Sequence, residues 1–465
     1  MAAPQQHDLT SGPVAKTLFL FALPALGTNI LQSINGSINS IYVGHFLGEN
    51  ALAATANATM IMFLMFSTLF GFAMAATILI GQAMGRRDVE AVRRTIGSAM
   101  GMFLIAGAVT ATFGWIFAPA LLKLMATPAD AYPYALAYLR VIFLGMPMSF
   151  LTILLSASLR GVGDAVTPLK NTMLNVALDV ALNPVFILGL GPVPKLGIAG
   201  SAMATLFAGL ISITTLIFRI YRSDATIRLR GAELSYLKPD MAYVKPIIAM
   251  GLPMGLSMII MSASSLVMLG LVNREGVDTT AAFGVMNQLW NYVQMPAVAV
   301  GSAVSAMVAQ NIGAQKWDRI DKVAMAGVGI NVLMTATLVL LITVATRQAA
   351  MLFLPAGSPA IEIAIHINRI VGWTFIMMGI SMVLTSVVRA NGAVIVPLLT
   401  LIVSAIFVRL GVGFAFHPAY GAEAIWRAFV AGGVVSMLLS LGYYRFGGWR
   451  KKHILPDEAE AVPAQ

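Results

Sequence analysis

Long segments without a charged residue recur along this chain, and they limit what it can fold into. The longest cover residues 50–85 and 279–315, and shorter ones include 95–122, 246–273 and 323–346. Only 10% of the 465 residues are charged and 58% are hydrophobic, a composition typical of membrane proteins. One helix of about 20 apolar residues spans the hydrocarbon core of a bilayer. The segments therefore predict an all-α polytopic membrane protein with twelve transmembrane helices.

The basic residues are distributed unevenly over the predicted loops. With the N-terminus placed inside the cell, the cytoplasmic side carries 21 of the 29 Lys and Arg residues, six of them in residues 219–245. This asymmetry follows the positive-inside rule, so both termini are predicted to be cytoplasmic. The net charge of +10 then reflects topology and contact with lipid headgroups, and we expect no nucleic-acid partner.

Sequence motifs for cofactors and catalysis are absent. The chain has no cysteine, its five histidines show no metal-ligand spacing, and it contains no Walker A loop. No paired carboxylates suit hydrolysis. We therefore expect no metal, no cofactor and no enzymatic activity, and we do not expect ATP to be the direct energy source.

The second half of the chain repeats features of the first at an offset of about 229 residues. The matching markers are Ala22-Leu-Pro24 with Gly251-Leu-Pro253, Arg140 with Arg369, Arg160 with Arg389, and Pro168 with Pro397. Six helices per repeat is an even number, so both halves insert the same way up. We expect them to be related by an axis along the membrane normal, with a site between them.

The basic stretch at 219–245 is the natural boundary between the halves. We therefore predict five regions along the chain. They are a cytoplasmic tail at 1–14, an N-lobe at 15–222 with helices 1–6, a linker at 223–243, a C-lobe at 244–445 with helices 7–12, and a second tail at 446–465.

A polar stripe interrupts the predicted fifth helix. Asn171, Asn175, Asp179 and Asn183 recur every four residues, so they lie along one side of a helix. If the helix starts near Pro168, a rise of about 1.5 Å per residue places Asp179 roughly 15 Å into the bilayer. An ionisable group at that depth is costly and indicates function. The asparagines fit a second interpretation equally well, as hydrogen-bonding contacts between helices.

A carboxyl group in apolar surroundings favours its neutral form and can take up a proton, whereas a nearby cation favours the charged form. Competition between a proton and a cation for Asp179 is therefore enough for exchange between two access states. The predicted ion-coupling set is Asp179, Asn175, Asn183, Pro184 and Asn39. Pro184 is included because it lacks the N–H that would bond the carbonyl of Val180. Asn35 and Asn39 of the first helix are predicted to form the facing wall.

A substrate cavity is predicted from polar and aromatic residues in apolar helices. Its residues are Asn35, Asn171, Phe63, Trp290, Gln288 and Asn291. The 29 methionines suit an adaptable apolar lining.

Other features of the apolar segments have structural interpretations. Glu423 and Arg427 are four residues apart and are expected to pair. Glu362 is a second possible acid, although an interfacial position is expected for it. Gly97 and Gly101 predict close packing of the third helix.

Five short motifs stand out, four at or after the ends of predicted helices and one within the fifth helix. They are Ile41-Tyr-Val-Gly44, Gly81-Gln-Ala-Met-Gly85, Leu159-Arg-Gly-Val-Gly-Asp164, Asn175 to Asn183-Pro184, and Gln310-Asn-Ile-Gly313-Ala314. Together with two six-helix halves, they resemble the multidrug and toxic compound extrusion (MATE) transporters, in particular the DinF-like prokaryotic branch. This resemblance covers residues 15–445. It implies antiport, in which H+ or Na+ enters as organic cations leave.

The sequence departs from the family pattern at its acids. The DinF-like branch has acids in the first and fifth helices, but Asn39 and Asn183 stand at those positions here, with Asp179 one turn before Asn183. The acids of the other branch, in helices 7 and 10, match Met261 and Met378. Coupling is therefore expected to depend on Asp179.

The combined prediction is a monomeric efflux antiporter of a bacterial inner membrane. It would exchange H+ or Na+ for small organic cations and contact membrane lipids. Two alternatives remain open, a lipid-linked sugar flippase of the same superfamily and an intramembrane enzyme or scaffold.

Overall fold

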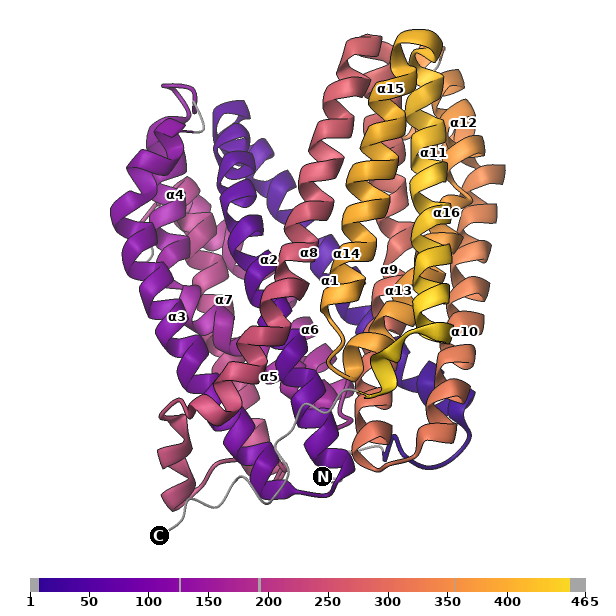
Figure 1. Cartoon of the computed structure of the whole chain (residues 1–465). Helices are drawn as coiled ribbons and strands as arrows, with labels where there is room; N and C mark the ends of the chain where they lie inside the picture. Colours follow the sequence, from indigo (N-terminus) through magenta and orange to yellow (C-terminus); the bar gives the residue numbers. More distant parts are fainter. Residues whose placement is uncertain (1–7, 125–126, 191–193, 356, 452–465) are drawn as a thin grey trace. The chain divides into compact units, whose positions relative to one another are not determined.

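The computed structural model describes residues 8–124, 127–190, 194–355 and 357–451. Helices make up most of these residues, and no strand occurs among them (Figure 1). The α-helices are α1 (Val14–Leu47), α2 (Glu49–Gly85), α3 (Val89–Leu124), α4 (Tyr132–Leu144), α5 (Met146–Gly161), α6 (Val166–Leu188), α7 (Ile198–Arg222), α8 (Met241–Val272), α9 (Val277–Gly313), α10 (Trp317–Val344), α11 (Thr346–Met351), α12 (Pro359–Val371), α13 (Thr374–Ala390), α14 (Ile395–Ile402), α15 (Gly411–Tyr420) and α16 (Ala422–Phe446). Short 3-10 helices are η1 (Gly231–Leu237), η2 (Asn273–Glu275) and η4 (Gly448–Lys451), and η3 (Val403–Leu410) is a π-helix.

The helices are long and apolar enough to cross a bilayer. In the described part of the chain, ten helical stretches meet this test, and the number rises to twelve when each of two bent helix pairs counts as one span. The predicted all-α membrane fold with twelve spans is confirmed.

The two bent spans lie at corresponding places in the two halves of the chain. Helices α4 and α5 meet at an angle of 52°, and α12 and α13 meet at 43°. In the first pair, Pro147 lies in the first turn of α5 and has no N–H to donate to the carbonyl of Phe143, so the helix breaks at Gly145. Gly107 of α3 packs against this break, since a Cβ atom there would lie 2.6 Å from Cα of Pro147.

The chain forms two compact units, and the division falls inside α1 and α8. One unit contains Gly27–Gly251, and the other contains Leu9–Leu26 together with the described chain from Leu252 onward. The start of α1 is held in the second unit, where Asn311 donates a hydrogen bond to the carbonyl of Leu9 (3.0 Å). The start of α8 is held in the first unit, where Gly251 packs against Phe72.

The linker between the repeats is packed on α3 within the first unit. A Cβ atom at Gly97 would lie 2.5 Å from Tyr236, and one at Gly101 would lie 2.0 Å from the carbonyl oxygen of Leu237. The close packing predicted for these glycines is therefore found, with the linker as the partner. Arg93 of α3 also forms an ion pair with Glu233 (2.5 Å). The pKa of Glu233 is lowered, first because the backbone N–H of Arg230 donates to its carboxylate and then because of Arg93.

Replacing Gly101 with alanine tests the packing of the linker. We expect a loss of about 1–3 kcal/mol in stability, because the new Cβ atom overlaps a backbone oxygen that must move. Gly209→Ala in α7 is the control, because nothing lies within 4 Å of a Cβ atom there and alanine favours helices. The apparent unfolding temperature of the purified protein in detergent measures both effects. Equal unfolding temperatures for the two variants would contradict the packing described.

Candidate functional site

Helix α6 carries the polar stripe. The residues that cap its start and its end can be identified. At the start, the Asp164 carboxylate accepts hydrogen bonds from the backbone N–H groups of Val166 and Thr167 (3.0 and 2.9 Å). These bonds satisfy N–H groups that have no partner within a helix, and the negative charge suits a helix N-terminus. At the other end, Gly189 adopts a left-handed conformation with φ of 73°. The stripe is therefore positioned by a helix that is capped at both ends.

Asp179 is buried in the middle of α6, with only 1% of its surface exposed. Its Oδ2 atom accepts a hydrogen bond from Nδ2 of Asn35 in α1 (2.9 Å). Its Oδ1 atom accepts from Oγ1 of Thr205 in α7 (3.0 Å) and from Nδ2 of Asn183 (3.2 Å). All three donors are neutral, and among the described residues no ion pair includes this carboxylate. The acid is thus held by dipoles alone.

A close approach of α7 to α6 brings Thr205 to the acid. A Cβ atom at Gly200 would lie 2.3 Å from the carbonyl oxygen of Phe186, so only glycine allows this separation. Asn39 of α1 contacts the same stretch of α7, because its Oδ1 atom accepts a hydrogen bond from Oγ of Ser201 (2.7 Å). The two asparagines of α1 therefore have different partners. Asn35 contacts the acid, and Asn39 contacts α7.

Three buried amide oxygens of α1 and α6 have no hydrogen-bond partner within the described chain. They are the Oδ1 atoms of Asn35, Asn171 and Asn183. Two of these side chains already donate to the carboxylate through their nitrogen atoms. A buried acceptor without a partner is unfavourable. The oxygens of Asn35 and Asn183 beside Asp179 therefore have the capacity to accept a hydrogen bond or to serve as ligands of a cation.

The remaining residues predicted for the first half have these positions. Asn175 is half-buried one turn before Asp179 and does not donate to the carboxylate in any hydrogen bond found among the described residues. Pro184 is half-buried inside α6, which continues to Leu188. Phe63 is 46% exposed on α2.

The residues predicted from α9 lie on different faces of that helix. Trp290 is buried in the core of the second unit, where its ring lies 5.3 Å from that of Phe375 at a tilt of 40° and its Nε1 atom donates a hydrogen bond to Oδ1 of Asn368 (3.1 Å). Gln288 and Asn291 are exposed. Positions two residues apart lie on nearly opposite sides of a helix. Trp290 therefore does not share a surface with Gln288.

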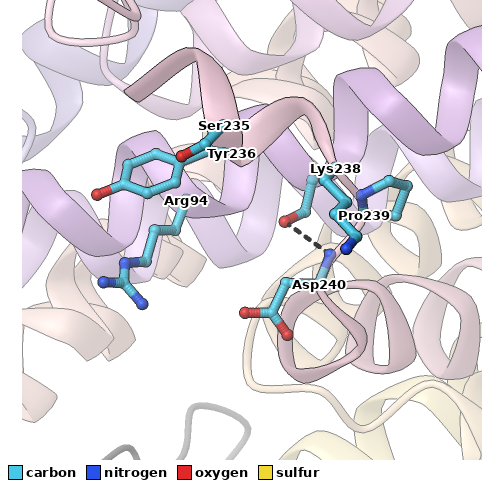
Figure 2. Close-up of a pocket in the computed structure, with 7 residues that line it drawn as sticks. Arg94, Ser235, Tyr236, Lys238, Pro239 and Asp240 are labelled. Atoms are coloured by element: carbon cyan, nitrogen blue, oxygen red, sulfur yellow. Dashed lines mark hydrogen bonds between the residues drawn. The ribbon is translucent and has the colours of Figure 1, made fainter. Parts of the chain in front are cut away.

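A pocket of about 310 Å³ lies at the docked linker, and none of the predicted site residues lines it. Its walls come from α3 and from the linker, as Figure 2 shows for Arg94, Tyr236 and Asp240. The guanidinium of Arg94 lies 5.3 Å from the centre of the Tyr236 ring, and the backbone N–H of Asp240 donates to Oγ of Ser98 (3.3 Å). Arg94 is also paired with Glu90. We assign this pocket to packing of the linker.

Sequence reasoning missed Thr205 and Ser201 of α7. Both are small hydroxyl residues one turn apart in an apolar helix, and Gly200 precedes them. This pattern of small residues is typical of a helix that packs closely on another. The small residues of α7 therefore indicate close helix packing in the sequence, but they do not identify the partner helix.

Removing the hydroxyl of Thr205 tests the contact with Asp179. Thr205→Val keeps the shape of the side chain and removes one of three donors to the carboxylate, so we expect a loss of about 1–2 kcal/mol in stability. Thr214→Val on the same helix is the control, since Thr214 is exposed and its hydroxyl donates to the carbonyl of Leu210 within its own helix. Thermal unfolding in detergent measures the difference. A Thr205 variant as stable as the Thr214 variant would rule out this hydrogen bond.

Comparison with known proteins identifies the family. The MatE family model matches the chain twice, over residues 24–185 and 253–415. The second match begins 229 residues after the first, which is the offset of the sequence markers. The chain belongs to the MATE family of transporters. Members of this family are transporters, so this MATE protein is not an enzyme.

Similar proteins cover nearly the whole of this MATE transporter. It is 34% identical over 443 residues to the probable multidrug resistance protein YoeA of Bacillus subtilis, with 95% of each chain covered. It is 23% identical over 455 residues to the probable multidrug resistance protein NorM of Thermotoga maritima, covering 96% of this chain and 95% of that one. Among solved structures, an outward-facing MATE transporter of the MOP superfamily matches with a TM-score of 0.88 and 20% identity, covering 97% and 100%. That likeness shows the fold.

Proposed function

We propose that this MATE transporter is a secondary active multidrug efflux antiporter in which Asp179 binds the coupling ion. H+ or Na+ entering the cell would exchange for organic cations leaving it, by alternating access between the lobes at residues 15–222 and 244–445. The observation that supports this most is the carboxylate of Asp179. It is buried in a membrane-spanning helix, and the hydrogen bonds to it found among the described residues come from the neutral donors Asn35, Asn183 and Thr205.

The contacts of Asp179 suit an acid that changes its occupant. A buried acid paired with Arg or Lys is already neutralised, and breaking such a pair is costly. An acid held by amide and hydroxyl dipoles keeps its charge available to a proton, to Na+ or to an organic cation. Binding of one excludes the others, and this exclusion is what couples two opposite fluxes.

The relatives support efflux over the flippase alternative. Proteins named as multidrug resistance proteins cover 95% or more of the chain at 34% and 23% identity. We therefore propose small organic cations as substrates. We also propose a bacterial inner membrane as the location, with both termini cytoplasmic, contacts with membrane lipids, and function as a monomer.

Transport by purified protein in liposomes tests the role of Asp179. An imposed pH gradient should drive uptake of a fluorescent organic cation by the wild type, and the same assay with a Na+ gradient identifies the coupling ion. Asp179→Asn keeps two hydrogen-bonding atoms but removes the charge. We expect it to lower gradient-driven uptake at least tenfold while the protein stays folded.

The control is a second acid changed to its amide. Glu362→Gln affects an exposed carboxylate at the start of α12 that pairs with Arg347, so we expect uptake within twofold of the wild type. Equal uptake by Asp179→Asn and the wild type would refute the role of Asp179. If neither gradient moves any cation, the efflux proposal fails and the flippase takes its place.

A further inference from the structure

A buried arginine in the second unit forms no ion pair with any acid in the described part of the chain. Arg409 lies in the span formed by α14, η3 and α15, and only 7% of its surface is exposed. No ion pair found in the described part of the chain includes it. A cationic side chain inside a membrane span is costly and is usually kept for a function.

The contacts of Arg409 orient its guanidinium without neutralising it. Its Nη2 atom donates to Oγ of Ser264 in α8 (2.7 Å), and that hydroxyl donates to the carbonyl of Ala405 (2.9 Å). The guanidinium carbon lies 5.1 Å from the centre of the Phe429 ring. Its Nε atom is buried and has no hydrogen-bond partner within the described chain. The side chain thus has unused capacity to donate to an acceptor.

The local backbone is built for this side chain. Arg409 lies in η3, a π-helix. Such helices are rare in proteins, and those that occur are often found at functional sites. Gly432 of α16 faces it, because a Cβ atom there would lie 3.1 Å from Cβ of Arg409. A larger residue at 432 would press on the arginine.

The internal repeat places Arg409 within one residue of the position that corresponds to Asp179. The offset between the halves is 229 at Pro168 and Pro397, and it is 230 at the ends of the two family matches. The second matched range is therefore one residue longer than the first, and it contains η3. With the offset of 229 Asn35 corresponds to Ser264, and Asp179 corresponds to Val408, the neighbour of Arg409; with the offset of 230 Asp179 corresponds to Arg409. The first repeat pairs an amide with a buried anion, and the second pairs a hydroxyl with a buried cation.

We propose that Arg409 binds the anionic group of a transported molecule, a carboxylate, sulfonate or phosphate. A guanidinium donates through two parallel N–H groups to such oxygens. The inference rests on the proposed transport function and adds a substrate class to it, molecules that carry a negative group, including zwitterions.

Two dyes that differ only in a free carboxylate test the assignment. Rhodamine 110 is a zwitterion, and rhodamine 123 is its methyl ester and a cation. Their binding to purified protein in phosphatidylcholine nanodiscs is measured by fluorescence polarisation. We expect Arg409→Gln to weaken binding of rhodamine 110 at least fivefold and to change binding of rhodamine 123 less than twofold. Arg409→Lys should weaken the binding of rhodamine 110 less than Arg409→Gln does, because lysine keeps the positive charge.

Arg427→Gln is the matched control, since Arg427 is an arginine of a membrane span that pairs with Glu423. We expect it to leave the binding of both dyes unchanged. Equal weakening of both dyes by Arg409→Gln, with a lower unfolding temperature, would assign a structural role to Arg409 and overturn the proposal. Unchanged or absent binding of rhodamine 110 would also overturn it.

Two further results distinguish this proposal from binding of a lipid headgroup and from the proposed efflux of cations. If adding phosphatidylglycerol displaces rhodamine 110 from the wild type but not from Arg409→Gln, the anion bound is a lipid headgroup, and the assignment to a transported molecule is wrong. If rhodamine 123 does not bind while rhodamine 110 binding depends on Arg409, cation efflux fails and the anion site stands.

Discussion

The interior of a membrane contains no water to complete the hydrogen bonds of a chain, and this constraint shapes every element described. Backbone groups must pair within the chain, so the described residues fold almost entirely into helices. Polar side chains face the same demand. Asp179 meets it with donors from α1, α6 and α7, so the acid also fixes how three helices of one unit pack together.

The two repeats hold buried groups of opposite charge. In the first, neutral donors surround a carboxylate. In the second, Ser264 and Phe429 hold a guanidinium on a wider helical turn. A single added residue rotates the remainder of a helix by about 100° around its axis. An added residue therefore changes which side chains of a span face its neighbours.

The sequence alone predicts much of the fold, because each membrane span is a long apolar segment. It also predicts the polar stripe on α6, because a spacing of four residues is close to the period of a helix. Thr205 could not be predicted as a partner, since its contact depends on the approach of α7 at Gly200. The burial of Trp290 could not be predicted from the sequence either. Lipid-facing and core-facing positions are both apolar, so hydrophobicity does not separate them. The 310 Å³ pocket depends on the docking of the linker, which leaves no periodic pattern.

The division of the units inside α1 and α8 has an evolutionary consequence. A duplicated ancestor is usually pictured as two copies that each fold alone. Here the start of α1 is anchored by Asn311 of the second unit, and the docked linker leads into a stretch of α8 that belongs to the first unit. Each half of the chain thus supplies a piece of the other's framework. Neither repeat is now a self-sufficient module, and the fused gene cannot easily return to two separate ones.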